Sequence, residues 1–180
     1  MNKTILPLLL LAMLASPCAS AATIVELGAE ASRAAPNDLA RATLFAEATG
    51  TAPAEAARKV NAMMVEAMAL AKSTTRIKVQ SGGTQTYPVY AKGGKIESWR
   101  MRSDLVLESA DTALLSELVG KLQGNLGVAS IALMPAPETR RKAENDATLD
   151  AIAAFRARAK LVAEAFGKPY RIKQMNIGQQ

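Results

Sequence analysis

Histidine is absent from this chain of 180 residues, and cysteine occurs once, at Cys18. Cys18 lies inside a segment that has the features of an export signal, so the exported protein would carry neither an imidazole nor a thiol. This excludes zinc sites built from Cys and His, Cys–His nucleophile pairs and disulfides. We therefore expect no metal, no cofactor and no catalytic residue.

The export signal is predicted from three consecutive features. A single charge at Lys3 precedes an apolar run from Ile5 to Leu14, and the small residues 19–21 follow. We expect cleavage after Ala21 and a periplasmic or secreted protein. The run is shorter than the roughly 20 apolar residues that span a bilayer, and no later segment approaches that length, so we expect no integral membrane segment.

Cys18 leaves a second possibility open, because an exported cysteine can accept a lipid. Pro17 precedes it, where a lipoprotein normally has a small unbranched residue. Cleavage without lipidation is the preferred interpretation. The remaining residues, 22–180, fit one domain of ordinary size.

Charge is mixed along the chain. There are 22 Lys and Arg residues against 16 Asp and Glu residues, which gives a net charge of +6. Nucleic-acid binders gather their basic residues on one element, whereas here bases alternate with acids. We expect a solvated surface and no nucleic-acid partner.

In the first half of the predicted domain, the spacing of apolar residues changes once, from every second position to every third or fourth position. Residues 24–34 and 39–49 alternate apolar and polar positions around the turn-forming residues 35–38, which predicts a β-hairpin. From Pro53 to Lys72 the apolar residues recur every three or four positions, which predicts a helix capped by Thr51. This helix is expected to lie on the apolar face of the hairpin.

The next segment predicts three strands and a short helix. Residues 75–80 and 84–91 flank a glycine pair that is expected to form a turn, and residues 96–108 form a longer strand. Asp111 is placed to cap a short helix that ends near Gly124.

A strand over 127–134, a long alanine-rich helix over 138–166 and a last strand over 170–177 complete the prediction. Gly167 marks the end of the long helix. The order of elements predicts an α+β fold, an antiparallel sheet with two long helices and one shorter helix packed on one face.

The polar face of this sheet is the candidate functional surface. With a tight hairpin turn, Glu26 would lie opposite Glu47, a like-charge pair that needs a neighbouring cation. We expect an electrostatically self-complementary face used in assembly. Its residues are Glu26, Glu30, Arg41, Glu47, Arg100, Arg102 and Asp104.

Three stretches resemble a known family. They are Tyr87–Tyr90, the strand from Ile96 to Leu107 followed by Ser109 and Asp111, and residues 137–144 leading into 154–159. With the order of elements, they make the chain similar to the SIMPL-domain family of exported bacterial proteins. The resemblance implies a periplasmic protein linked with envelope or oxidative stress, and some relatives look like ring-shaped oligomers. Relatives usually continue past the strand at 170–177 into one further strand, whereas this sequence stops at Gln180, so either a sheet edge is left open or the chain is trimmed.

The expected function is therefore that of a non-catalytic envelope protein that self-associates as a homo-oligomer and supports stress tolerance. Two alternatives stay open. One is a module that binds a small ligand between helix and sheet, and the other is a hydrolase that uses only carboxylates, serine or lysine.

Overall fold

The computed structural model of the chain describes residues 23–176. The predicted signal, its cleavage site and Cys18 lie outside this range. Seven elements follow one another along the chain: β1 (Leu39–Gly50), α1 (Pro53–Ser73), β2 (Lys78–Tyr90), β3 (Ile96–Ser109), α2 (Thr112–Leu122), β4 (Gly127–Met134) and α3 (Pro137–Phe166).

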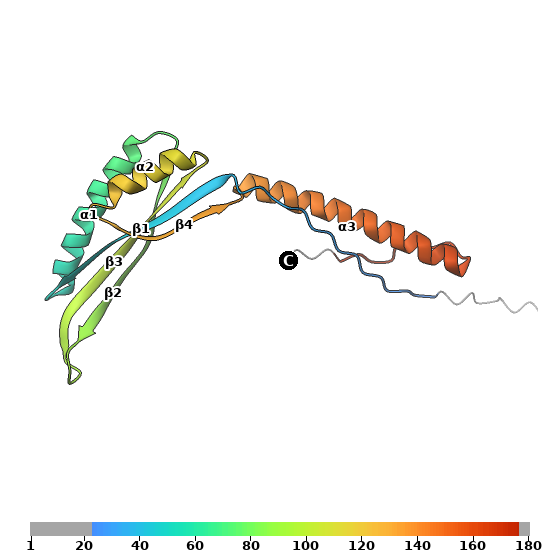
Figure 1. Ribbon diagram of the computed structural model, residues 1–180. Helices are drawn as coiled ribbons and strands as arrows, with labels where there is room; N and C mark the ends of the chain where they lie inside the picture. Colours follow the sequence, from blue (N-terminus) through green and yellow to red (C-terminus); the bar gives the residue numbers. More distant parts are fainter. Residues whose placement is uncertain (1–22, 177–180) are drawn as a thin grey trace, which may run out of the picture.

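The four strands form one antiparallel sheet in the order β2-β3-β1-β4. Each of the helices α1 and α2 connects two strands that have a third strand between them, so the sheet consists of two interlocked β–α–β units. Both helices lie on the same face, and the other face is open (Figure 1). The predicted α+β class is confirmed.

The core lies between α1, α2 and the two central strands. Alternate residues of β1 and β3 point into it, and most of those from β1 are alanines, which let α1 approach the sheet closely. The fully buried larger side chains are Leu44, Leu105, Leu107, Leu115 and Val60.

Both core helices begin at defined polar contacts. Glu55, in the first turn of α1, accepts hydrogen bonds from the Thr51 backbone N–H at 2.9 Å and from the Lys59 ammonium at 2.7 Å. These donors lower the pKa of Glu55 to about 2. The cap residue itself is Ala52 rather than the predicted Thr51. At α2 the predicted cap is confirmed, because Asp111 accepts from the Leu114 N–H at 3.0 Å.

The predicted hairpin between residues 24–34 and 39–49 is wrong. Residues 23–38 are extended but belong to no strand. The physical reason is that β1 has a neighbour on each side, β3 and β4, so neither of its edges is free to pair with residues 24–34.

Helix α3 also differs from the prediction, because it extends away from the sheet instead of packing on it (Figure 1). Residues 23–38 run beside it, and Arg33 forms an ion pair with Asp150 while Arg158 donates to the Gly28 carbonyl. We call α3 and residues 23–38 together the arm. Gly167 ends the helix in the left-handed conformation with φ 63°, as predicted, but residues 170–176 form no strand.

Asp38 joins the two parts of the arm where they leave the sheet. Its carboxylate accepts from the Ala136 N–H at 2.7 Å and from the Thr139 hydroxyl. Ala136 is the cap residue of α3 and makes no side-chain cap hydrogen bond, and Asp38 instead anchors the start of the helix through the Ala136 N–H and the Thr139 side chain. These two hydrogen bonds hold the pKa of Asp38 below its ordinary value.

We expect an NMR titration of the Asp38 carboxyl group to have its midpoint below pH 3.8, the ordinary value. Thr139→Val removes one donor and should raise the midpoint. Thr148→Val on the same helix removes a hydroxyl that donates elsewhere, to the Glu144 carbonyl, and should leave it unchanged. Because the folded pKa is depressed, the stabilisation is complete above pH 3.8 and is lost as the pH falls through the folded value. A midpoint at or above 3.8 would contradict this.

The predicted turn at Gly82 and Gly83 is also wrong. These residues form a bulge inside one continuous strand, β2, where its register against β3 shifts between Ser81 and Thr84. A Cβ atom on Gly82 would lie 2.8 Å from the Cβ of Asp104, whereas one on Gly83 would meet no atom within 4 Å. The bulge brings the Gly82 backbone against β3.

Gly82→Ala is therefore expected to lower the free energy of unfolding by about 1–3 kcal/mol, the usual cost of forcing an extra methyl into a packed contact. Gly83→Ala is the matched control, and it should be neutral or slightly stabilising because alanine restricts the unfolded chain. Urea unfolding of both variants measures the difference. Equal effects of the two substitutions would show that the close approach at Gly82 is not what matters.

Candidate functional site: the open face of the sheet

The open face of the sheet carries the charged residues that the sequence singled out. Register places Glu47 opposite Arg102 and Arg41 opposite Glu108 on β1 and β3. Arg100 and Asp104 lie on the same side of β3, because residues two apart in a strand share a face. Five of the seven predicted residues thus come together on one surface: Arg41, Glu47, Arg100, Arg102 and Asp104.

The other two predicted residues lie elsewhere. Glu26 and Glu30 are exposed and belong to the extended segment beside α3. The expected like-charge pair between Glu26 and Glu47 does not form, since the residue opposite Glu47 is Arg102. The prediction failed at this point because it rested on the hairpin.

Each central charge on the open face has a partner of opposite sign. Arg100 lies 3.7 Å from Glu47, and the Arg102 Nε donates to Asp104 at 2.9 Å. Their side chains are about one third to two fifths exposed, so solvent screens both pairs. These pairs fix side-chain positions more than they stabilise the fold.

Glu108 has the least exposed carboxylate among the ion-paired acids on this face. It lies between Arg41 of β1 at 3.6 Å and Lys78 of β2 at 3.3 Å, and its side chain is 15% exposed. It links the two strands that flank β3. Alternation along β3 places Glu108 on the same side as Arg102 and Asp104, but its two partners depend on the register of three strands.

Phe45 is the residue on this face that sequence reasoning missed. Arg102 lies over its ring, 3.8 Å from the ring centre, in a cation–π contact. The ring also covers Gly127 of β4, where a Cβ atom would come within 2.4 Å of it. An aromatic side chain that covers a strand glycine is a known way to pin register. The sequence shows an aromatic residue in one predicted strand and a glycine in another. Only the register of the two strands places them opposite each other.

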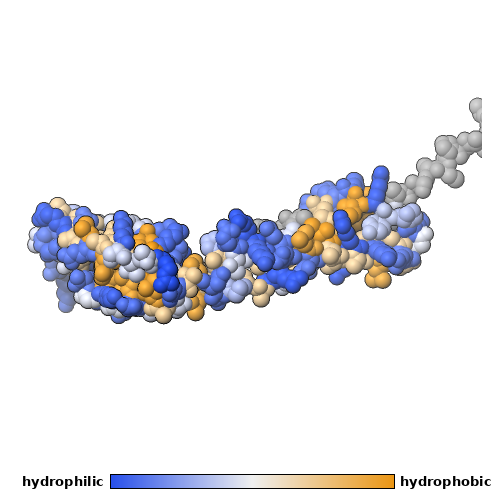
Figure 2. Space-filling view, turned by 90° about the horizontal axis from the view of Figure 1, so that it is seen from above, coloured by the Kyte–Doolittle hydropathy of each residue, from blue (hydrophilic) through white to orange (hydrophobic). Residues whose placement is uncertain are grey.

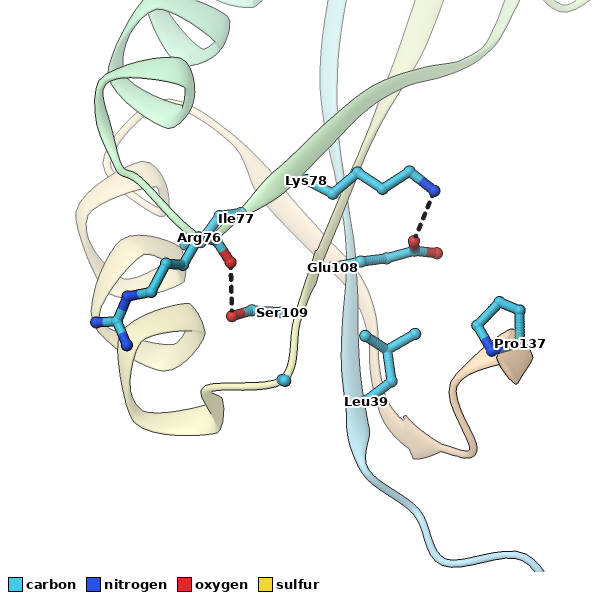
Figure 3. Close-up of a pocket in the computed structure, with 8 residues that line it drawn as sticks. Leu39, Arg76, Ile77, Lys78, Glu108, Ser109 and Pro137 are labelled. Carbon is cyan, nitrogen blue, oxygen red and sulfur yellow. Dashed lines mark hydrogen bonds and ion pairs between the residues drawn. The ribbon is translucent and has the colours of Figure 1, made fainter. Parts of the chain in front are cut away.

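A shallow hollow of ≈ 480 Å³ lies near the point where α3 leaves the sheet. Leu39 and Pro137 form part of its wall, with Lys78 and Glu108 above them (Figure 3). Its other lining residues are Arg76, Ile77, Ser109 and Ala110.

The polar groups of the hollow are largely engaged with one another. Ser109 donates to the Arg76 carbonyl at 3.0 Å and accepts from the Asp111 N–H at 3.0 Å, while the Arg76 guanidinium lies 3.2 Å from Asp111. Arg76 has a positive φ of 69°, which is uncommon for arginine, and these contacts hold it there. The hollow therefore offers a ligand few polar groups that lack a partner.

The chemistry of the open face is that of fixed, paired charges. Within residues 23–176 no three acidic, histidine or cysteine side chains are grouped so that they would hold a metal ion. In the same range, none of the helices has a stretch long and apolar enough to cross a bilayer.

The fold is an α+β sandwich made of two β–α–β units, with one face of the sheet open. The family model of SIMPL, described as "Protein of unknown function (DUF541)", matches residues 25–180, so the chain belongs to the SIMPL family. This confirms the resemblance seen in the sequence. No curated protein sequence matches the chain significantly.

Two solved structures show weak similarity. One, described as a "putative amidohydrolase/peptidase" from Burkholderia cenocepacia, is 15% identical with a TM-score of 0.35, over 53% of this chain and 28% of that one. The other, an amidase of the hydantoinase/carbamoylase family from Burkholderia multivorans, is 12% identical with a TM-score of 0.33, over 74% and 34%. The chain spans well under two thirds of either structure, and neither similarity carries an argument about activity.

We expect Phe45→Ala to lower the free energy of unfolding by about 2 kcal/mol, because it removes a half-buried ring from both Gly127 and Arg102. Thr43→Ala, two residues earlier on the same face of β1, is the matched control and should cost less than about 0.5 kcal/mol. Denaturant unfolding followed by circular dichroism gives both values. If Phe45→Ala lowered the free energy of unfolding no more than the control does, the ring would not stabilise the sheet.

Proposed function

We propose that this SIMPL-family protein is exported and non-catalytic, that it self-associates, and that it supports tolerance of envelope or oxidative stress. The observation that carries the proposal is the arm. Its helix has 30 residues, and Ala159 is the only one of them that is buried.

The arm exposes large apolar side chains. Leu149 is 66% exposed, Leu161 67% and Phe166 63%, and further apolar residues are exposed along residues 23–38 and 168–176. Hydrophobic surface gathers toward the far end of the arm (Figure 2). Apolar surface of this extent on a soluble chain marks an interaction site.

A helix of this kind needs a partner to be stable. Most helical stability in proteins comes from packing of one face rather than from intrinsic propensity. In α3 that packing comes mainly from a thin extended segment joined to it by Arg33, Gly28 and Asp38. Association with further copies would supply the missing packing, and this supports a homo-oligomer.

The non-catalytic part of the proposal follows from side-chain chemistry. The sequence has no histidine, and its single cysteine lies in the predicted signal. On the open face the carboxylates Glu47, Asp104 and Glu108 lie beside cations. These ion pairs engage the acidic side chains of the open face.

Export and the stress role rest on the sequence. The predicted signal supports a periplasmic or secreted location, and the stress role is what the family resemblance implies. The small hollow keeps a ligand-binding alternative open, and a thermal-shift screen tests it, because a ligand that prefers the folded state must raise its melting temperature.

Light scattering on the purified mature chain tests self-association directly. We expect a molar mass of at least twice that of the monomer, and a loss of mass in a variant with both Leu149→Glu and Leu161→Glu, because charges on the arm oppose its burial. Val65→Glu is the control, since Val65 is a similarly exposed apolar residue (68%) on α1. A monomeric wild-type chain at micromolar concentration would refute self-association.

The stress role needs a cellular measurement. Cells that lack the protein should survive peroxide or detergent less well, the wild-type gene should restore survival, and the arm variant should not. If the variant with Leu149→Glu and Leu161→Glu restored survival fully, stress tolerance would not require self-association.

A further inference from the structure

The two edges of the sheet are protected to very different degrees. An exposed edge strand offers free backbone groups to other chains, and proteins block such edges with charges, prolines and bulges. Strand β2, at one edge, has all three: Lys78, Pro88 and the Gly82–Gly83 bulge. These features oppose pairing of the β2 edge with a strand of another chain.

Strand β4, at the other edge, has neither a charge nor a proline, and its one irregularity is a bulge at Ala129, where its register against β1 shifts between Thr43 and Leu44. Its sequence, GVASIALM, contains no charge and no proline. Within the described residues its backbone pairs with β1 alone, so its outer edge is free. After the bulge, residues 130–134 keep one regular register, and an uncharged stretch of this kind at a free edge is a template for pairing with another strand.

Apolar side chains lie along the same edge. Register places Ile131 opposite Ala42 and Leu133 opposite Ala40, so both point to the face that α1 and α2 cover. Ala40 and Ala42 are fully buried there, yet Ile131 is 57% exposed and Leu133 55%. The two helices contact β1 and β3, α1 also contacts β2, and the part of β4 that holds Ile131 and Leu133 is left uncovered.

We infer that two copies of this chain pair through their β4 strands in antiparallel orientation, which joins their sheets into one continuous sheet. This inference rests on the proposed self-association and names its surface. A two-fold interface brings each residue toward its own symmetry mate, so a self-pairing strand must place no like charges opposite one another. β4 meets this condition because it has no charged residue.

The apolar side chains fit the same arrangement. In an antiparallel pair, residues that face each other lie on the same side of the sheet. Ile131 and Leu133 of one copy would therefore meet those of the second copy on the helix-covered side. Residues 24–34 of the same chain are not available for this edge, because Arg33 and Gly28 hold them against α3.

Strand pairing alone buries too little surface for a stable dimer. A strand of eight residues is about 27 Å long, so pairing along its edge buries only a narrow strip of surface. Stable interfaces bury about 800 Å² on each partner. Helix α3 begins three residues after β4 ends and is about 45 Å long. In the antiparallel pair, the end of one β4 lies beside the start of the other, so α3 passes its partner and adds the exposed Leu149 and Leu161 to the interface.

Single cysteines test the pairing without depending on stability. In a Cys18→Ser background, any introduced thiol is unique. Residues near the two-fold axis lie close to their own symmetry mates, so at least one of Ala129→Cys, Ser130→Cys and Ala132→Cys should form a disulfide-linked dimer under mild oxidation. Thr86→Cys, exposed on the protected strand β2, is the matched control and should remain monomeric on a non-reducing gel.

A charge substitution gives the second test. Ile131→Lys places a charge on the open edge and should weaken dimerisation by at least about tenfold. Ile96→Lys is the control, because Ile96 is 50% exposed and lies at the far end of the β2–β3 hairpin. Sedimentation gives the dissociation constants, and circular dichroism checks that both variants are folded.

The outcomes separate the two proposals. Wild-type association with no β4 cross-link in any of the three variants, or with equal effects of Ile131→Lys and Ile96→Lys, would overturn β4 pairing and leave self-association standing. A monomeric wild-type chain would overturn both. A cross-link confined to β4 together with a selective loss in Ile131→Lys would establish the interface.

Discussion

Packing of α1 against the alanine-lined side of β1 is the constraint on which the rest of the structure depends. Ala40, Ala42 and Ala46 are fully buried with Leu44, and they bring the helix close to the sheet. Helices α1 and α2 occupy the area over β1 and β3, and α3 extends away from the sheet instead of covering β4. The outer part of one edge strand is therefore exposed.

Elements with one strong periodic face could be predicted from the sequence. The stripe of α1, the alternation of β3, the Asp111 cap and the Gly167 stop each depend on neighbours within a few residues, and the structure has them. The composition of the open face followed from the same alternation. Its ion pairs did not, because they depend on which strands are neighbours and in what register.

The failures share a physical cause. Residues 24–34 alternate like a strand, but alternation does not specify a partner, and β1 already had two. The Gly82–Gly83 pair looked like a turn because a bulge uses the same residue type. The alanine-rich stripe of α3 is compatible with a close approach to a sheet, but small side chains define no particular surface, and the proline-flanked connection at Pro135 directs the helix away.

These features place the unusual properties of the chain on one side of the molecule. On the open face the charges lie beside opposite charges of the same chain, Glu47 with Arg100 and Glu108 with Arg41 and Lys78, although the Arg100 Nε is buried without a hydrogen-bond partner. The edge of β4 is uncharged and poorly covered, and the arm exposes apolar side chains among its charged ones. Folding of one copy leaves these surfaces unburied, and a second copy is the simplest partner that offers the same surfaces in complementary orientation.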